Sequence, residues 1–255
     1  MEKTGSRKKI VIVVILCIVM CALLAGMFAM RAYRRHVAAW QVQQRNQKGI
    51  LLAFDDYNPN SWSEHFDLFD KYGVKVTFFV NLKEPDEFCA EAVKRGHEIG
   101  FHTVGHAKLT EVSKEEFYEE TIAPIENFRS QGYGLTSFAY PYGRYEDWMN
   151  EELLQHYETV RGAYHFMGYY KESLKKGFME AYPLDNTYFE SDEQFREKVE
   201  ELLDVLVGCD DGTVACVYSH AISGGGWCIT ADRLEILFRE AAERNLVFYT
   251  FQELQ

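Results

Sequence analysis

Two short segments of this chain carry residue types that could hold one metal ion. Asp55 and Asp56 directly follow an apolar run at residues 50–54. His102 and His106 are separated by three residues. Two histidines four positions apart can reach one side of a helical turn, and a carboxylate from another strand end would complete three protein ligands. Such a set leaves a coordination position open for water or substrate, which is typical of metal-dependent hydrolases.

The elements that must position these residues follow a regular alternation after residue 48. Short β-rich runs alternate with amphipathic segments, and the runs are 50–54, 74–80, 98–102, 136–140, 159–163, 213–219 and 246–250. Helix starts are indicated by capping boxes at Ser113 with Glu116 and Ser191 with Gln194, and by an N-cap at Thr230. The alternation predicts a parallel α/β domain, either an open sheet or a barrel.

The polar candidates all fall at the same end of the predicted strands. The acid pair follows the first run, His102 ends another, Pro141-Tyr142-Gly143 follows a third, and His220 ends a fourth. In both architectures, active sites collect at the carboxyl ends of the strands. Each piece is weak alone, because adjacent Asp residues are common in turns and a single His is often a core residue. Their occurrence after successive strands favours a site.

Charge is distributed unevenly along the 255 residues, of which 47% are hydrophobic. The length suits one sizeable globular domain. Residues 1–48 contain nine Lys or Arg and one Glu, which leaves 18 basic and 38 acidic residues in 49–255, a net charge of −20. A domain this acidic is a poor partner for nucleic acid or other polyanions. No feature of the sequence indicates a particular oligomeric state.

The N-terminal part has the composition of a membrane anchor. Ile10–Met30 contains no charged residue and matches the roughly 20 apolar residues that cross a bilayer. We therefore expect a short basic segment at 1–9, a transmembrane signal anchor at 10–30, a juxtamembrane stalk at 31–47 and a folded domain at 48–255. A cleaved signal peptide is the alternative, although the apolar stretch exceeds the roughly 7 to 15 residues of a signal h-region.

Four cysteines lie outside the apolar segment. They are Cys89, Cys209, Cys216 and Cys228. Because none forms a C-x-x-C pair, a structural zinc site is not expected. An even number permits disulfides without requiring them, so buried thiols and one bridge are both open.

At these motifs the chain resembles the polysaccharide deacetylases, carbohydrate esterases with a NodB-type domain. The motifs are Ala53-Phe54-Asp55-Asp56, residues 96–110 with both histidines, Phe138-Ala-Tyr-Pro-Tyr-Gly143, Val217-Tyr-Ser-His220 and the terminal residues 248–254. The resemblance covers nearly all of 48–255. It implies a distorted (β/α) barrel of NodB type with fewer than eight regular units, preceded here by the one N-terminal transmembrane helix.

The resemblance also implies a metal ion. Asp56, His102 and His106 would bind a divalent ion, with zinc expected first and cobalt, nickel or manganese as alternatives. Asp55 would be the general base and His220 the general acid. Strand alternation alone does not say which Asp has which role.

Other roles come from the Pro-containing motif and from the loops. The resemblance implies that the backbone N–H of Tyr142 faces the developing oxyanion, with Pro141 fixing the turn and both residues near the substrate. Trp227, after a glycine-rich loop, is a candidate for stacking on a sugar, or else for burial against the domain.

One departure from the family concerns the charge beside the base. Many members carry an Arg where this chain has Ala139, which leaves the partner of Asp55 unassigned. Arg161, at the next predicted strand, is a candidate substitute, with a surface Arg as the alternative. Asp185 is a candidate for orienting His220, with a turn Asp as the alternative.

Together these features predict a membrane-anchored, metal-dependent hydrolase that removes N-acetyl groups from peptidoglycan or an exported polysaccharide by general acid/base catalysis. Basic residues flank the apolar segment on both sides, so charge alone does not orient it. From the expected substrate, we place the catalytic domain outside the cytoplasm. Two alternatives are a hydrolase of a small non-sugar amide, which a narrow closed site would favour, and a non-catalytic glycan-binding protein.

Overall fold

The computed structural model describes residues 47–163, 168–171 and 177–254. The predicted basic segment, the anchor at 10–30 and all but the last residue of the stalk lie outside these residues. Within the described part, no helix combines the length and the apolar character needed to cross a bilayer.

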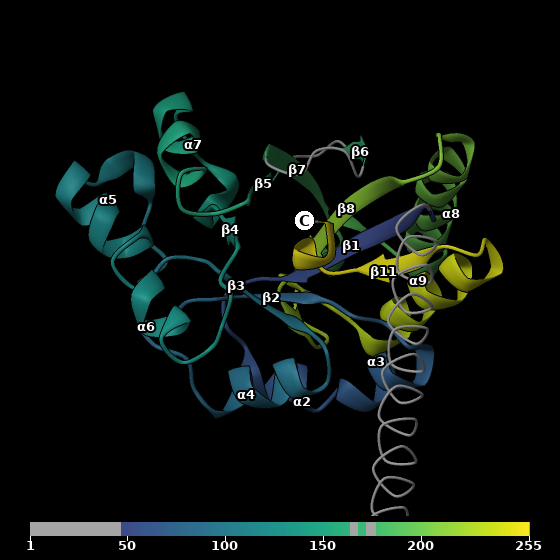
Figure 1. Ribbon diagram of the computed structural model, residues 1–255. Helices are drawn as coiled ribbons and strands as arrows, with labels where there is room; N and C mark the ends of the chain where they lie inside the picture. The colour runs from purple at the N-terminus through teal and green to yellow at the C-terminus, as the bar shows by residue number, and fades with distance from the viewer. Residues whose placement is uncertain (1–46, 164–167, 172–176, 255) are drawn as a thin grey trace, which may run out of the picture. The chain divides into compact units, whose positions relative to one another are not determined.

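Parallel strands form a closed sheet at the centre of the domain (Figure 1). In the described residues these are β1 (Gly49–Phe54), β2 (Thr77–Val80), β3 (Glu98–Phe101), β4 (Ser137–Ala139), β5 (Thr159–Ala163), β7 (Gly177–Pro183) and β8 (Thr213–Ser219). Each pairs with the next, and β8 pairs with the whole length of β1, which closes the barrel. The structure therefore selects the barrel over the open sheet and matches the expected distorted (β/α) architecture.

Two further strands account for the distortion. β11 (Val247–Tyr249) pairs with the first half of β1, so β2 contacts only the last two residues of β1. β6 (Tyr169–Lys171) runs antiparallel to residues 213–215 of β8. β7 pairs with β8 at only two later positions, Val217 and Tyr218. A separate two-stranded parallel sheet, formed by β9 (Ala221–Ile222) and β10 (Cys228–Ile229), follows β8 in the chain.

Helices surround the barrel on its outer side (Figure 1). The described helices are α2 (Pro59–Ser63), α3 (Phe66–Tyr72), α4 (Glu87–Lys94), α5 (Lys114–Thr121), α6 (Ile125–Arg129), α7 (Asp147–Leu153), α8 (Asp192–Gly208) and α9 (Ala231–Glu243). Single turns of 3₁₀ helix occupy Leu109–Glu111, Pro141–Gly143, Asn186–Tyr188 and Phe251–Leu254.

The predicted helix starts are confirmed. The Ser113, Ser191 and Thr230 side chains each accept a hydrogen bond of 3.2 Å from the backbone N–H three residues later. One detail differs from a standard capping box, since Gln194 accepts from the N–H of Glu190 rather than from that of Ser191. These bonds satisfy N–H groups that the first turn of a helix leaves without partners.

Two apolar cores result from the alternation of side chains along the strands. On β1, Ile50, Leu52 and Phe54 pack outward against the helices, whereas Leu51 and Ala53 belong to the cluster inside the barrel. The inward series 51, 53 continues at residue 55. Alternation therefore directs Asp55 towards the mouth of the barrel.

The four cysteines of the described domain are free thiols. Burial raises the pKa of Cys89 and of Cys216, each to about 12. Both side chains consequently stay protonated at neutral pH and act as small apolar core residues. Of the two open expectations, the structure has thiols and no bridge among these cysteines.

Candidate active site

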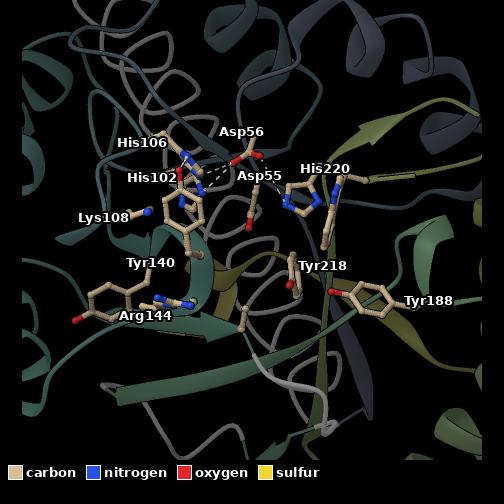
Figure 2. A pocket seen from close by; sticks show the side chains of 14 residues that line it. Asp55, Asp56, His102, His106, Lys108, Tyr140, Arg144, Tyr188, Tyr218 and His220 are labelled. Carbon is tan, nitrogen blue, oxygen red and sulfur yellow. Dashed lines mark hydrogen bonds and ion pairs between the residues drawn. The ribbon is translucent and has the colours of Figure 1, made fainter. Parts of the chain in front are cut away.

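Three side chains converge at the carboxyl ends of β1 and β3 in an arrangement that could hold a metal ion. One oxygen of Asp56 lies 3.2 Å from Nε2 of His102 and 3.0 Å from Nε2 of His106 (Figure 2). The three donor atoms all lie within 4.8 Å of one another. One carboxylate and two imidazoles form a three-ligand set that suits a catalytic divalent ion.

Hydrogen bonds prepare these side chains for coordination. His102 is buried, and its Nδ1 donates to the carbonyl oxygen of Ala139 at 2.8 Å, which leaves the lone pair on Nε2. Burial would raise the pKa of Asp56, but hydrogen bonds from His102 and His106 outweigh it and hold that pKa well below its usual range. Asp56 is therefore ionised at any pH where the imidazoles could bind a metal.

The two histidines do not lie on a helical turn, contrary to the expectation from their spacing. They flank a loop between β3 and the turn at Leu109, in which Thr103 and His106 have φ values of 66° and 54°. Asp56 also has a positive φ, 69°. Left-handed backbone is unfavourable for residues other than Gly and concentrates at functional sites.

Glu120 on α5 holds the histidine loop. Its carboxylate accepts a hydrogen bond from the N–H of Gly105 at 2.7 Å, and its carbonyl oxygen accepts one from Val104 at 3.2 Å. The loop is thus fixed from outside the barrel by a helix that contains none of the three metal-site residues.

Asp55 forms a buried ion pair with Arg161, which lies in β5. Nη2 of Arg161 donates to Oδ2 of Asp55 at 2.5 Å, and both side chains are almost fully buried. The guanidinium lies 5.2 Å from the ring centroid of Phe79 and 4.8 Å from that of Tyr218. Oδ1 of Asp55 has no hydrogen-bond partner in the described part of the chain. A buried carboxylate oxygen without a partner is costly, which points to a ligand or water there.

His220 directly follows β8 and faces the metal site. Its Nδ1 lies 3.0 Å from Oδ2 of Asp185, a fully buried residue that also accepts a hydrogen bond from Ser219 at 2.6 Å. Nε2 of His220 lies 3.8 Å from the second oxygen of Asp56. Burial lowers the pKa of His220, but the hydrogen bond and charge of Asp185, with the charges of Asp55 and Asp56, raise it to about 8.

The Pro-containing motif forms a tight turn beside His106. Tyr142 has φ 59° and ψ 5°, and the N–H of Gly143 donates to the carbonyl oxygen of Tyr140 at 3.0 Å, as in a type II turn. That position normally favours Gly, so Tyr142 is strained. Its hydroxyl lies 3.2 Å from Nδ1 of His106, and its side chain is 54% exposed.

These groups line one open pocket of about 560 Å³ (Figure 2). The lining residues are Asp55, Asp56, His102, His106, Lys108, Tyr140, Tyr142, Gly143, Arg144, Ala163, Tyr188, Tyr218, His220 and Trp227. Trp227 is 63% exposed rather than buried against the domain. Pro141 is buried and does not line the pocket, so its direct contribution is to the turn and not to a substrate surface.

The sequence model of a family described as polysaccharide deacetylase matches residues 42–159. This segment contains the acid pair, both histidines of the metal site and the Pro-containing turn. This part of the chain is similar to the polysaccharide deacetylase family. His220, which lines the pocket, and its buried partner Asp185 lie beyond the matched segment.

Curated relatives align with parts of the domain. The chain is 29% identical over 114 residues to the peptidoglycan-N-acetylglucosamine deacetylase PgdA of Listeria monocytogenes, which covers 43% of this chain and 24% of that protein. It is 33% identical over 115 residues to the peptidoglycan-N-acetylmuramic acid deacetylase PdaC of Bacillus subtilis, covering 42% and 24%. The chain thus spans about a quarter of the length of these polysaccharide deacetylases.

Solved deacetylase structures share the fold over most of the chain. PdaC of B. subtilis superposes with a TM-score of 0.56 at 21% identity, covering 82% of this chain and 91% of that one. The chitin deacetylase of Colletotrichum lindemuthianum gives 0.57 at 18% identity, covering 80% and 86%. The barrel, including the strands beyond residue 159, therefore has the same fold as these two solved deacetylases.

Several pocket residues were not among the sequence-based candidates. Lys108, Arg144, Tyr188 and Tyr218 line the pocket. Lys108 and Tyr218 lie within the motifs at residues 96–110 and 217–220, whereas Arg144 and Tyr188 lie outside the motifs. Lys108 follows His106 by two residues. Arg144 directly follows Gly143, the last residue of the Pro-containing turn. Proximity to those motifs was the signal that could have identified them.

Proposed function

We propose that this chain is a metal-dependent deacetylase that hydrolyses N-acetyl groups on a glycan. The observation that carries the proposal is the arrangement around Asp56, His102 and His106. A carboxylate paired with Arg161 and an imidazole paired with Asp185 line the same pocket as this set. A base and an acid beside a Lewis-acid site are what amide hydrolysis requires.

Asp56, His102 and His106 would hold the divalent ion. Zinc fits one carboxylate and two imidazoles, and cobalt, nickel and manganese are the alternatives. When bound, the ion polarises the acetyl carbonyl and makes water acidic enough to be deprotonated near neutral pH.

Asp55 would act as the general base. Its Oδ2 is held by Arg161, whereas its Oδ1 has no partner among the described residues and is available to accept a proton from water. The N–H of Asp55 donates to the carbonyl oxygen of Ser219 at 2.9 Å, which extends the β1–β8 ladder and fixes the base relative to His220. The amide N–H of Tyr142 would donate to the carbonyl oxygen as negative charge develops there.

His220 would act as the general acid. An amine is a poor leaving group unless its nitrogen is protonated, and the raised pKa of His220, about 8, keeps the imidazole cationic at neutral pH. Asp185 holds Nδ1, so the proton on Nε2 is the one that can be given to the departing nitrogen.

The form of the pocket favours a glycan over a small amide. It is open, and Tyr142, Tyr188 and Trp227 supply aromatic surface around the metal site. The C–H faces of sugars bury well against such rings, whereas a small non-sugar amide is better held in a narrow closed site. The complete set of acid, base and metal-site groups disfavours a non-catalytic glycan-binding protein.

We also propose, from composition alone, that residues 10–30 anchor the enzyme in the membrane with residues 48–255 outside the cytoplasm. N-terminal sequencing of the mature protein tests this. A start near Met1 and resistance to extraction by high salt support the anchor, whereas a start beyond Met27 indicates a cleaved signal peptide.

Acetate release from acetylated glycans tests the activity. The full chain should release acetate from peptidoglycan fragments or N-acetylglucosamine oligosaccharides, lose this activity after chelation, and regain it with added zinc or cobalt. Hydrolysis of small acetamides with no turnover of glycans would support the alternative substrate class. Glycan binding without turnover under any metal would leave only the binding role.

A further inference from the structure

Two basic residues border the pocket in a domain that is otherwise strongly acidic. Residues 49–255 contain 18 basic and 38 acidic residues. Apart from the acid pair and the three histidines, the charged residues that line the pocket are Lys108 and Arg144. Both are basic, although acidic residues outnumber basic ones about two to one in the domain.

The two cations lie on the same side of the pocket. Figure 2 shows Lys108 and Arg144 on the side of His106, with Tyr188 on the side of His220. Lys108 follows His106 by two residues, and Arg144 follows the turn that contains Tyr142. Nζ of Lys108 lies 5.8 Å from the ring centroid of Tyr142. Both cations are therefore attached to the motifs that surround the metal site.

Within the described part of the chain, neither charge is neutralised by a buried ion pair. Lys108 approaches Glu111 at 3.7 Å, but the side chains are 50% and 60% exposed, and such surface pairs contribute little. Arg144 has no ion pair with any residue in the described ranges and is exposed. The acidic groups of the site have other partners, since Asp55 pairs with Arg161 and Asp56 contacts three histidines.

From this arrangement we propose that Lys108 and Arg144 bind a carboxylate of the substrate, so that the enzyme prefers an N-acetylated glycan with an acidic group near the scissile amide. This inference rests on the proposed deacetylase function and specifies its substrate class. An anionic glycan is repelled by a domain with net charge −20, so productive binding needs local positive charge at the site. A planar guanidinium and an ammonium group are the side chains that bind carboxylates.

The carboxylate could belong to the acetylated sugar itself or to the neighbouring sugar, and matched substrates distinguish these two cases. A tetrasaccharide of alternating N-acetylglucosamine and N-acetylmuramic acid carries it on an ether of every second acetylated sugar, the N-acetylmuramic acid. A hyaluronan tetrasaccharide carries it on the neighbouring sugar. The N-acetylglucosamine tetrasaccharide has none. We expect the full chain to hydrolyse one of the acidic substrates with a higher kcat/KM than the neutral one. Preference for hyaluronan identifies a carboxylate on the neighbouring sugar, and mass spectrometry of the product from the alternating tetrasaccharide shows which of its two sugars has lost acetate.

Substitution of the two cations tests their role. In Lys108→Gln/Arg144→Gln, the ratio of kcat/KM for the acidic over the neutral substrate should fall by about tenfold, mainly through KM. Lys108→Arg/Arg144→Lys keeps both charges and should keep most of the preference. Lys94→Gln/Arg239→Gln removes two exposed charges that are not part of the pocket lining and is the matched control. An unchanged ratio in the first variant, or an equal fall in the control, would overturn the proposal.

Binding measured by calorimetry keeps this inference separate from the proposed activity. If no glycan releases acetate, the deacetylase function fails, and the same oligosaccharides can still be titrated into the wild type and the variants. A carboxylate-dependent affinity that disappears in Lys108→Gln/Arg144→Gln supports the pair. Equal affinity for acidic and neutral oligosaccharides in wild type and variant overturns it. Thermal unfolding checks that each variant is folded.

Discussion

Ala139 and Arg161 are direct partners in the parallel register of β4 and β5. Ala139 lies in the cluster inside the barrel, and Arg161 extends from the adjacent position to Oδ2 of Asp55. The resemblance to the polysaccharide deacetylases predicts an Arg at the position of Ala139. We infer that the positive charge beside the base comes here from the neighbouring strand, which explains why the Pro-containing motif can begin with Phe-Ala.

The first prediction concerns variants in which the positive charge beside Asp55 is removed from β5 or supplied from β4 instead. Arg161→Ala should lower kcat/KM by about 10²-fold or more, because the base loses the group that orients it. It should also destabilise the fold by about 3–5 kcal/mol, since a buried carboxylate is left without its counter-charge. The double variant Ala139→Arg/Arg161→Ala should recover part of both losses. Acetate release and thermal unfolding measure these effects. Equal activity in the single and double variants would argue that the location of the charge matters as well as its sign.

The second prediction separates base from metal-site residue. Asp55→Asn keeps the shape of the side chain but removes the proton acceptor, so turnover should be abolished while metal content stays near that of the wild type. Asp56→Asn should lower both. Elemental analysis alongside the acetate assay gives the two quantities. The reverse pattern would exchange the roles assigned to the two carboxylates.

The third prediction concerns the metal stoichiometry. The wild type should bind about one divalent ion per chain through one carboxylate and two imidazoles, and His102→Ala/His106→Ala should lose it. His97→Gln is a useful control, because His97 is buried among aromatic rings, 5.5 Å from the ring of Phe66, and lies outside the pocket. Equal metal in the wild type and the double variant would exclude this site.

The fourth prediction follows from the pKa of His220. In the metal-free protein, NMR titration should place this pKa near 8, and Asp185→Asn should lower it, because the neutral amide no longer stabilises the imidazolium. A bound divalent cation disfavours the protonated form, so the alkaline limb of activity should lie at or below pH 8. Activity should fall as the pH rises through this limb, since the general acid is then neutral.

His220→Ala gives a second test of the same role. It should damage hydrolysis of an N-acetyl amide much more than that of an activated aryl ester, whose leaving group needs no proton. Metal content should hold. An equal loss for ester and amide would assign His220 to substrate positioning or to the fold.

The fifth prediction concerns Glu120, which acts on the metal site through the histidine loop. Glu120→Ala should weaken metal affinity by about tenfold, because the N–H of Gly105 loses its acceptor. Glu120→Gln retains a carbonyl oxygen that can accept this bond and should restore most of the affinity. Competition with a metal chelator measures the difference. Identical weakening in the two variants would indicate an electrostatic effect of the carboxylate instead.

The sequence by itself determined the features that depend on neighbouring residues. Side-chain alternation and the three N-caps are local, so they predicted strands before Asp55, His102 and His220 and the helix starts at Ser113, Ser191 and Thr230. The histidine spacing was misleading in one respect, because positive φ values at Thr103 and His106 bring the two rings together from a loop and not from a helix. The short strand β6, the two-residue strands β9 and β10, and β7 were not predicted.

Only the tertiary structure decided which distant residues meet. Asp55 and Arg161 are 106 positions apart, and Asp185 and His220 are 35 apart. Local propensity carries no information about such pairs, whose geometry depends on the order of strands around the barrel and on the β1–β8 pairing that closes it. The same closure gathers Lys108, Arg144, Tyr188 and Trp227 around one pocket from separate loops. The catalytic residue types are thus readable along the chain, whereas their partners and the surface offered to a substrate follow from the closed sheet.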